Sequence, residues 1–178
     1  MELQTVRLRL HPLPPEALGL GARTGDVGPL MGYPPEKADR KTRAAARRIY
    51  AAKSALCRRE PETWLLCTAW QLITRDTEEL IGEAGFKGPP AAGAVEIGYG
   101  VRPLFRNKGY MTEAVEALCR FVFAQTIRSV SAVCAATRKD NLASQRVLQK
   151  CGFGRSGTRG RLLMWEKRVL SSELQGDA

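Results

Sequence analysis

A short loop that combines two cations, a glycine and the start of a helix has the residue types needed to bind an anion. The loop joins a strand-like run, residues 94–99, to a helix-like run, residues 111–124. Its residues are Arg106, Asn107, Lys108, Gly109, Tyr110, Met111 and Thr112. The first turn of a helix leaves backbone N–H groups unpaired, and the helix dipole favours negative charge there. We therefore expect this loop to bind phosphate, with Arg106 and Lys108 adding positive charge.

A second group of polar residues follows about thirty residues downstream, at the start of another helical pattern, residues 141–151. Asp140 or Asn141 stands where an N-cap is expected, and Gly152 stands where a left-handed residue would end the helix. Ser144 lies in the first turn and can donate a hydrogen bond. Asn141 is therefore interpreted as structural, tying the loop before the helix to the ligand-binding side, and Ser144 as a candidate both for chemistry and for ligand binding.

Two glutamates are the candidates for acid–base chemistry. Glu96 stands in a strand-like run, residues 94–101, among neighbours that are otherwise apolar or small, and Glu83 stands in the preceding strand-like run. A carboxylate can take a proton from an amine directly or through one water molecule. Glu96 is the first choice and Glu83 the second. Either could instead bind an ammonium group without moving a proton, or be a solvated strand residue.

The scarcity of other residue types excludes several mechanisms. The single histidine, His11, precedes a proline, which excludes a histidine-rich metal site and disfavours a Ser-His or Cys-His pair. The five cysteines form no CxxC pair and lie mostly in apolar segments, as buried thiols in a reducing compartment do. We expect no metal site and no covalent acyl-cysteine intermediate.

The elements that must position these residues follow from periodicity and turn signals. The helices are expected to start near residue 15, and to span 35–59, 109–124 and 141–151, with a glycine-rich loop over 19–32. The strands are expected at 2–10, 63–74, 79–87, 94–101 and 129–137, with a closing hairpin of 153–158 and 161–169. In the helix 35–59, the inner face is predicted from an apolar stripe, namely Ala45, Ile49, Ala52 and Leu56.

Length and charge limit the functional class. A chain of 178 residues is long enough for one domain with a sizeable core. We find neither a signal peptide nor an apolar run long enough to span a membrane, and we expect a soluble, cytoplasmic protein without a membrane partner. The net charge of +10, concentrated in residues 36–60 and 101–168, suits a polyanionic ligand or a nucleic acid equally well.

The order of these elements and the two motifs together resemble the GNAT superfamily of acyl-CoA-dependent N-acetyltransferases, over about residues 3–168. The family's phosphate loop, Arg/Gln-x-x-Gly-x-Gly/Ala, is similar to the stretch from Arg106 to Met111. The family's second motif is similar to Asn141, Ser144 and Gly152-Phe153. Met111 departs from the pattern, because the family prefers a very small residue there, so its side chain must point away from the diphosphate. The branch that the chain most resembles is that of ribosomal-protein N-terminal acetyltransferases.

The resemblance implies a fold and a coenzyme. The fold would be α+β, a single domain over residues 1–169 with a flexible tail, 170–178. Its central sheet would be mixed and mostly antiparallel, with a splayed parallel pair of strands and flanking helices. Acetyl-CoA would be the cosubstrate, and its pantetheine arm would run along the backbones of Tyr99 and Val101, where Gly98 and Gly100 leave room.

The resemblance also implies a chemistry, in which an amine attacks the thioester directly. Many family members use a tyrosine as acid seven residues after the motif asparagine, but that position here is Leu148. Ser144 is the family's alternative for protonating or hydrogen-bonding the leaving sulfur. The base would be Glu96 or Glu83.

Three functions remain open at this stage. The acceptor amine could be a protein N-terminus, with a ribosomal protein or the ribosome as partner, or it could belong to a small molecule such as an antibiotic or a metabolite. From a different class, the basic segment 40–59 could make the chain a nucleic-acid-binding or ribosome-binding module, although only Tyr50 offers an aromatic ring there. A monomer or a homodimer is expected.

Overall fold

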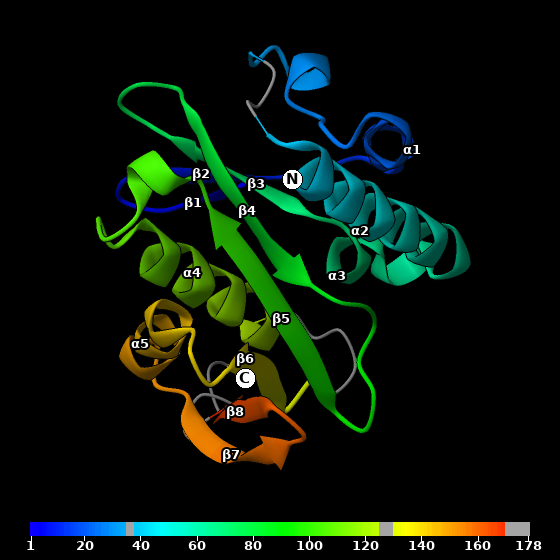
Figure 1. Ribbon diagram of the computed structural model, residues 1–178. Coiled ribbons are helices and arrows are strands. Elements are labelled where there is room, and N and C mark those ends of the chain that lie inside the picture. Colours follow the sequence, from blue (N-terminus) through cyan, green and yellow to red (C-terminus); the bar gives the residue numbers. More distant parts are fainter. Residues whose placement is uncertain (35–37, 125–129, 170–178) are drawn as a thin grey trace.

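The computed structural model describes residues 1–34, 38–124 and 130–169, and it places eight strands in one sheet (Figure 1). The order across the sheet is β1-β2-β3-β4-β5-β6-β8-β7. The strands are β1 (Leu3–Gln4), β2 (Leu8–Pro12), β3 (Trp70–Thr74), β4 (Leu80–Phe86), β5 (Ala94–Val101), β6 (Ala132–Arg138), β7 (Gly154–Arg159) and β8 (Leu162–Arg168). The α-helices are α1 (Pro15–Thr24), α2 (Arg40–Arg59), α3 (Trp64–Cys67), α4 (Tyr110–Ala124) and α5 (Leu142–Lys150), and the short 3₁₀ turns are η1 (Pro29–Met31), η2 (Pro61–Thr63) and η3 (Pro103–Phe105).

The sheet is mixed, as predicted. Its neighbouring strands are antiparallel except for β5 and β6, which are parallel and joined through α4. A parallel pair needs such a crossover, whereas the antiparallel pairs β1–β2, β3–β4, β4–β5 and β7–β8 follow one another directly through short connections. The predicted fold class, an α+β domain with one parallel pair of strands, is confirmed.

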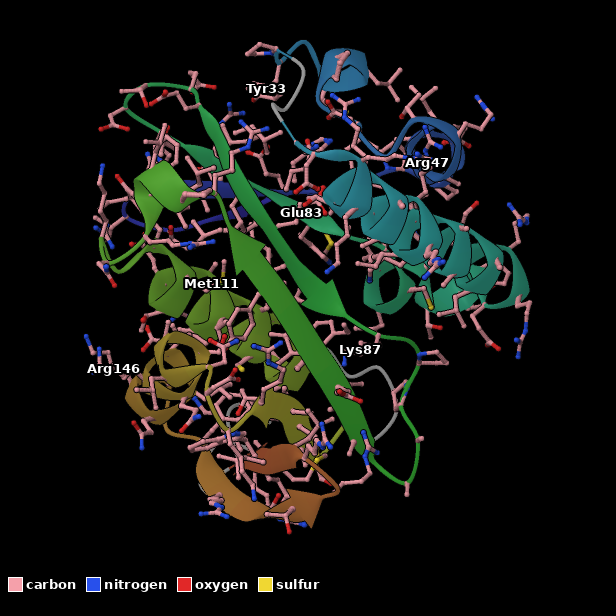
Figure 2. All side chains as sticks on the ribbon, viewed as in Figure 1. Tyr33, Arg47, Glu83, Lys87, Met111 and Arg146 are labelled. Carbon is pink, nitrogen blue, oxygen red and sulfur yellow. The ribbon has the colours of Figure 1, made fainter. Side chains whose placement is uncertain are left out.

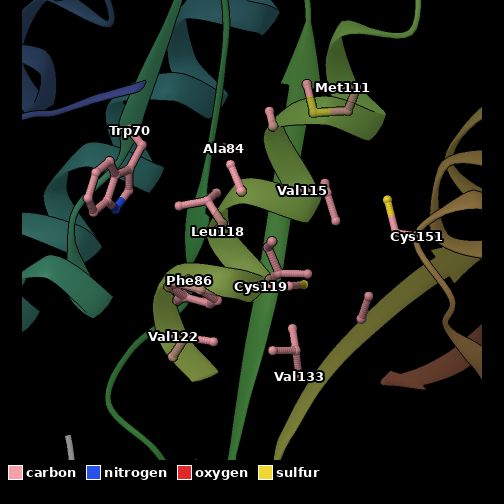
Figure 3. Packing of buried hydrophobic residues seen from close by; sticks show 14 of the residues in the cluster. Trp70, Ala84, Phe86, Met111, Val115, Leu118, Cys119, Val122, Val133 and Cys151 are labelled. Atoms are coloured by element: carbon pink, nitrogen blue, oxygen red, sulfur yellow. The ribbon is translucent and has the colours of Figure 1, made fainter. Parts of the chain in front are cut away.

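Helices cover both faces of the sheet and define two cores (Figure 1). On one face, α4 packs on β2, β4 and β5, and its buried side chains join those of the strands in one large cluster (Figure 3). Phe121 of α4 meets Trp70 of β3 with 5.3 Å between ring centroids. On the other face, α1, α2 and α3 build a smaller cluster that includes Leu18, Tyr50 and Cys67. The site lies between these layers, along β5.

Two predictions near the N-terminus are wrong. The segment 2–10 is not one strand but a hairpin, because the Thr5 hydroxyl accepts a hydrogen bond from the Leu8 N–H (2.9 Å) and turns the chain. The glycine-rich segment is not all loop, since α1 continues through Gly19 and Gly21 to Thr24. A Cβ at Gly21 would lie 2.6 Å from the Tyr50 ring, so this glycine allows α1 to pack closely on α2. Tertiary packing here overrides the low helix propensity of glycine.

Two further predictions are wrong in the segment that follows. The first half of the expected strand 63–74 is helical, because η2 and α3 precede β3 and the Trp70 indole N–H donates to the Leu65 carbonyl (3.0 Å). The apolar stripe of α2 is not its inner face, since Ile49 is 53% exposed whereas Tyr50, Ser54 and Cys57 are buried. Helix α2 begins at Arg40 with Asp39 as N-cap.

The remaining boundaries agree with the predictions within one to three residues. The predicted starts at residues 35 and 129 and the predicted tail, 170–178, fall outside the described residues. Within the described part of the chain, no helix combines the length and the apolarity that crossing a membrane requires.

Candidate active site

The strands β5 and β6 pair only along their first halves. Their register covers three positions, from Ala94 opposite Ala132 to Glu96 opposite Cys134. Beyond this point, a cavity of about 170 Å³ lies between the strands and the start of α5. Its lining comes from Lys87, Ile97, Gly98, Tyr99, Ala135, Ala136, Thr137, Asn141 and Ser144. We call this cavity the gap.

The backbone of β5 faces the gap with hydrogen-bonding groups. The Glu96 carbonyl accepts from the Lys87 N–H (2.7 Å), and the Arg102 N–H donates to the Ile81 carbonyl (2.8 Å), so these even-numbered residues direct their groups toward β4. Backbone groups alternate along a strand. Tyr99 and Val101 therefore direct theirs toward the gap, where an extended amide-bearing chain can pair with them.

The phosphate loop lies where β5 gives way to α4. Asn107 and Gly109 have positive φ angles of 60° and 80°, a conformation that turns successive N–H groups toward one side. The first bond of the helix runs from the Glu113 N–H to the Gly109 carbonyl (3.2 Å). The N–H groups of Tyr110, Met111 and Thr112 precede it and are not used by the helix. This arrangement suits a diphosphate, and the loop is where the sequence placed it.

Arg7, a residue that the sequence reasoning missed, braces the loop. Its guanidinium donates to the Lys108 carbonyl (2.9 Å) and to the Glu113 carboxylate (2.8 Å), and it lies 4.7 Å from the centre of the Tyr110 ring. Burial acts to raise the pKa of Glu113, but hydrogen bonds from Thr5 and Arg7 outweigh it and lower that pKa. No local pattern in the sequence could have indicated a contact across a hundred residues.

The Met111 side chain points away from the loop, as expected. It is 6% exposed and belongs to the large core, where Figure 3 shows it at the start of α4 above Val115. A large side chain is accommodated at this position because only the backbone of the residue faces the loop. The departure from the family pattern therefore leaves the loop open.

Asn141 and Tyr99 together hold the start of α5 against the gap. The Asn141 side-chain carbonyl accepts from the Ser144 N–H (3.2 Å), which confirms it as the N-cap. The Tyr99 hydroxyl donates to the Ser144 carbonyl (3.1 Å), and burial raises the pKa of that hydroxyl far above its ordinary value. Tyr99 therefore stays neutral and structural, while Ser144 lines the gap.

A larger cavity of about 910 Å³ lies on the opposite face of β5, under α2. We call it the cleft. Its floor consists of Glu83 and the small residues of β4 and β5, and one wall contains Ile49, Ala52 and Leu56 of α2. The apolar stripe that was predicted to be core thus faces the cleft. Figure 2 shows Glu83 pointing from β4 toward α2, and the Tyr50 hydroxyl donates a hydrogen bond to its carboxylate.

Lys53 is a partly buried cation in the wall of the cleft. Its ammonium donates to the carbonyls of Phe86 (2.7 Å) and Thr68 (2.9 Å), and thereby ties α2 to β4 and to the segment before β3. Burial lowers the pKa of Lys53 to about 8, although the nearby Glu83 acts to raise it. A lysine on a basic helix gives no sequence signal of this role.

The two glutamates occupy different places. Glu83 lines the cleft, whereas Glu96 lines neither cavity and instead accepts a hydrogen bond from the Lys87 ammonium (2.5 Å). Three residues, Lys87, Gly98 and Tyr99, line both cavities. The gap and the cleft therefore meet at the middle of β5. Of the two candidate glutamates, Glu83 is the one whose carboxylate lines the cleft.

Burial raises the pKa of all five cysteine thiols. All five are free thiols, four are buried, and burial raises the pKa of Cys57, Cys119 and Cys151 to between about 11 and about 12. Burial, reinforced by Glu166 and Glu96, also raises the pKa of Cys134. Among the described residues, no group of three or more His, Cys, Asp or Glu side chains gathers as a metal site would require.

Relatives of known sequence and structure carry the same architecture. Residues 7–154 match the family described as Acetyltransferase (GNAT) domain. The uncharacterized N-acetyltransferase YjdG of Bacillus subtilis is 36% identical over 86 residues, which cover 48% of this chain and 50% of YjdG. The chain thus spans about half the length of the curated relatives it matches.

Solved structures agree over almost the whole chain. The ribosomal L7/L12 alpha-N-protein acetyltransferase RimL, solved with coenzyme A, is 15% identical and superposes with a TM-score of 0.65, covering 95% of this chain and 98% of RimL. The ribosomal-protein-S5-alanine acetyltransferase of Vibrio fischeri is 14% identical with a TM-score of 0.65, covering 94% and 96%. At this identity the likeness concerns the fold. Because the family match covers most of the chain and the gap and phosphate loop lie within it, the chain belongs to the GNAT acetyltransferase family.

Proposed function

We propose that this chain transfers an acetyl group from acetyl-CoA to a primary amine that attacks the thioester directly. One observation carries the proposal: the gap, whose walls suit the coenzyme, and the cleft, which is open to an acceptor, meet at Gly98 and Tyr99. A transferred group must be reachable from both substrates at once. Gly98 contributes no side chain there, and Lys87 also lines the meeting point.

The gap, the end of β5 and the phosphate loop together fit the parts of the coenzyme. The diphosphate would bind the backbone N–H groups from Lys108 to Thr112, with the side chains of Arg106 and Lys108 supplying charge. The pantetheine amides would pair with the backbone groups of Tyr99 and Val101. Asn107 contributes the left-handed turn that shapes the loop. Each contact uses a group that the fold leaves available on that side.

Glu83 is the group that we propose to receive the proton of the attacking amine. It lies in the floor of the cleft, and the hydrogen bond from Tyr50 fixes its carboxylate. A primary amine arrives mostly protonated at neutral pH and must lose a proton before or during attack. Glu96, the first choice from the sequence, is engaged by Lys87 outside the lining of the cleft, so we prefer Glu83.

We propose a peptide N-terminus as the acceptor. The cleft has an apolar wall that includes the half-exposed Ile49, and the Glu83 carboxylate lies in its floor. A short peptide suits this pattern, because its side chains can pack on the apolar wall while its terminal ammonium binds near the carboxylate. Two of the structural neighbours are described as ribosomal-protein acetyltransferases. A small-molecule amine is the competing acceptor.

The test combines binding with turnover. Calorimetry with coenzyme A should give a one-to-one complex, and incubation with radiolabelled acetyl-CoA should label peptides that carry a free N-terminus. N-terminally blocked copies of the same peptides are the matched control. Labelling of small amines but not of peptides would move the acceptor to the small-molecule class, and a failure to bind coenzyme A would remove the proposed activity altogether.

A further inference from the structure

This protein lacks the tyrosine that the resemblance predicts as proton donor to the leaving sulfur. The position where the resemblance predicts an acid is Leu148, which is fully buried in the large core. The Tyr99 hydroxyl donates to the Ser144 carbonyl, and the Ser144 hydroxyl, which lines the gap, carries no positive charge. Loss of a thiolate still benefits from a positive charge or a hydrogen-bond donor at the sulfur.

A lysine lies where the gap and the cleft meet. Of the three residues that line both the gap and the cleft, Lys87 alone carries a charge. Its side chain lies over the glycine at the meeting point, since a Cβ on Gly98 would come within 3.4 Å of the Lys87 Cε. Figure 2 shows Lys87 beside the middle of β5, away from the phosphate loop.

The fold fixes Lys87 in this place. Its N–H donates to the Glu96 carbonyl (2.7 Å) at the end of β4, and its ammonium donates to the Glu96 carboxylate (2.5 Å). An ammonium has three N–H donors, and Glu96 accepts one of them. The side chain is 56% exposed, so the ammonium can bind a group that enters from the gap.

The same face carries other charged groups around this pair. Glu96 lies opposite Cys134 in β6, which in turn lies opposite Glu166 in β8, and Arg168 donates to Glu166 (2.6 Å). Glu166 is therefore engaged by its own cation, as Glu96 is engaged by Lys87. Lys53 is a nearby cation, but it lines the cleft only, so Lys87 is the one cation among the described residues that line both cavities.

We propose that the Lys87 ammonium stabilises the departing thiolate of coenzyme A and that Glu96 is the positioning residue that holds it there. This inference rests on the proposed acetyl transfer. The amine nitrogen forms a bond to the thioester carbon, the carbonyl oxygen takes up negative charge, and collapse of this intermediate breaks the C–S bond and leaves its electron pair on sulfur. The nitrogen loses its proton through Glu83 to solvent, and Lys87 holds the thiolate until release.

The inference makes Glu96 important for a reason other than the one the sequence suggested. Glu96 would neither touch the acceptor nor take its proton. It would keep the ammonium from turning toward solvent, which a long lysine side chain otherwise does readily.

The decisive measurement titrates the thiol of bound coenzyme A by its ultraviolet thiolate absorbance in the intact protein. In the unsubstituted protein, the thiol should ionise at lower pH when bound than when free, for which the ordinary value is about 8.5. In Lys87→Met the shift should vanish, and in Lys87→Arg most of it should remain. Lys150→Met, which removes an exposed lysine at the end of α5, is the matched control and should behave as the unsubstituted protein does.

Turnover and binding separate this role from a structural one. Lys87→Met should lower kcat roughly 10- to 100-fold with little change in the KM for acetyl-CoA, because the charge acts when the sulfur leaves. Binding of desulfo-coenzyme A, which lacks the thiol, should be the same in both proteins. Glu96→Gln should give a smaller loss of kcat in the same direction.

The outcomes distinguish the role of Lys87 from the proposed acetyl transfer on which it rests. If the unsubstituted protein transfers acetyl groups but its bound thiol ionises no lower than free coenzyme A, or if Ser144→Ala abolishes the shift while Lys87→Met retains it, the role of Lys87 is wrong and the acetyltransferase stands. If the unsubstituted protein neither binds coenzyme A nor transfers, both proposals fail. The titration of the bound thiol in the unsubstituted protein needs no substitution, so misfolding of a variant cannot affect that result.

Discussion

The gap and the cleft lie on opposite sides of β5, yet they are built in different ways. The gap lies between β5, β6 and the start of α5, and the proposed coenzyme contacts there and in the phosphate loop are mostly to backbone groups, so they depend on the path of the chain. The cleft is lined by side chains from α2, β4 and β5 that the chain brings together over long separations, as Tyr50 and Glu83 are 33 residues apart. A site built from backbone groups tolerates substitutions, as Met111 illustrates. In a site built from side chains, each substitution can change the ligand contacts. We therefore propose that the gap and the phosphate loop bind the coenzyme, with Arg106 shared with the cleft lining, and that the rest of the cleft binds the acceptor.

Among the variants that separate the two cavities, Glu83→Gln in the cleft should have the largest effect. We expect kcat/KM to fall by about 10²-fold or more, because the amide cannot accept the amine proton, while the Kd for coenzyme A stays unchanged. Steady-state kinetics with a labelled peptide and calorimetry check the two quantities. Glu62→Gln, at an exposed glutamate of η2, is the control. An equal loss of coenzyme affinity would show that the two cavities are not independent.

The pH dependence of stability tests whether the partly buried Lys53 ammonium holds the wall of the cleft. Its pKa is about 8 in the folded protein and 10.5 ordinarily. Between these values the unfolded chain binds more protons than the folded one, so this group makes stability rise as the pH increases from about 8 toward 10.5. The rise should be on the order of 3 kcal/mol before other groups are considered.

The measurement compares urea unfolding of the unsubstituted protein and Lys53→Met near both ends of this pH range. Buried thiols such as Cys57 act in the opposite direction, because a raised thiol pKa lowers stability as the pH rises above its ordinary value. The difference between the two proteins isolates the lysine. Lys41→Met, on the exposed start of the same helix, should follow the unsubstituted protein. Parallel curves for Lys53→Met would contradict the assignment.

The coenzyme side is tested by Gly109→Val. Gly109 has a φ of 80°, and a Cβ there would lie 3.3 Å from the Arg7 guanidinium, so the loop must distort. We expect a stability loss of about 1–3 kcal/mol and a coenzyme affinity at least tenfold weaker. Gly160→Val is the matched control, since Gly160 also has a positive φ, of 59°, but lies in the β7–β8 turn. If both variants bind coenzyme A equally well, the loop is not the diphosphate site.

The smallest effect is expected at the apolar wall. Ile49→Asp should raise the KM for a peptide acceptor severalfold and leave the KM for acetyl-CoA unchanged, because Ile49 lines only the cleft. Its exposure predicts a stability change within about 0.5 kcal/mol. Leu30→Asp, at an exposed leucine of η1 outside the cleft lining, is the control. An unchanged acceptor KM would mean that this stripe is surface rather than a binding wall.

The predictions from sequence succeeded and failed according to the range of the interactions involved. The helices α4 and α5, the strand β5 and the loop between them were predicted within a residue or two, since their caps, glycines and periodicity are local. The segments 19–32 and 63–74 were misassigned because glycines at a helix contact and tryptophan packing decide their conformation. The stripe of α2 was recognised but assigned to the wrong partner, because an apolar face predicts burial without saying what will cover it.

By itself, the sequence determined the crossover from β5 through the phosphate loop to α4, the cap at Asn141 and the family to which the chain belongs. These features depend on backbone conformation, which neighbouring residues control. Only the tertiary structure decided that Glu83 lies in the floor of the cleft, that Lys87 engages Glu96 at the junction of two cavities, and that Arg7 braces a loop 101 residues away. Such contacts form where strands from distant parts of the chain are brought into register, and residue type alone does not specify that register.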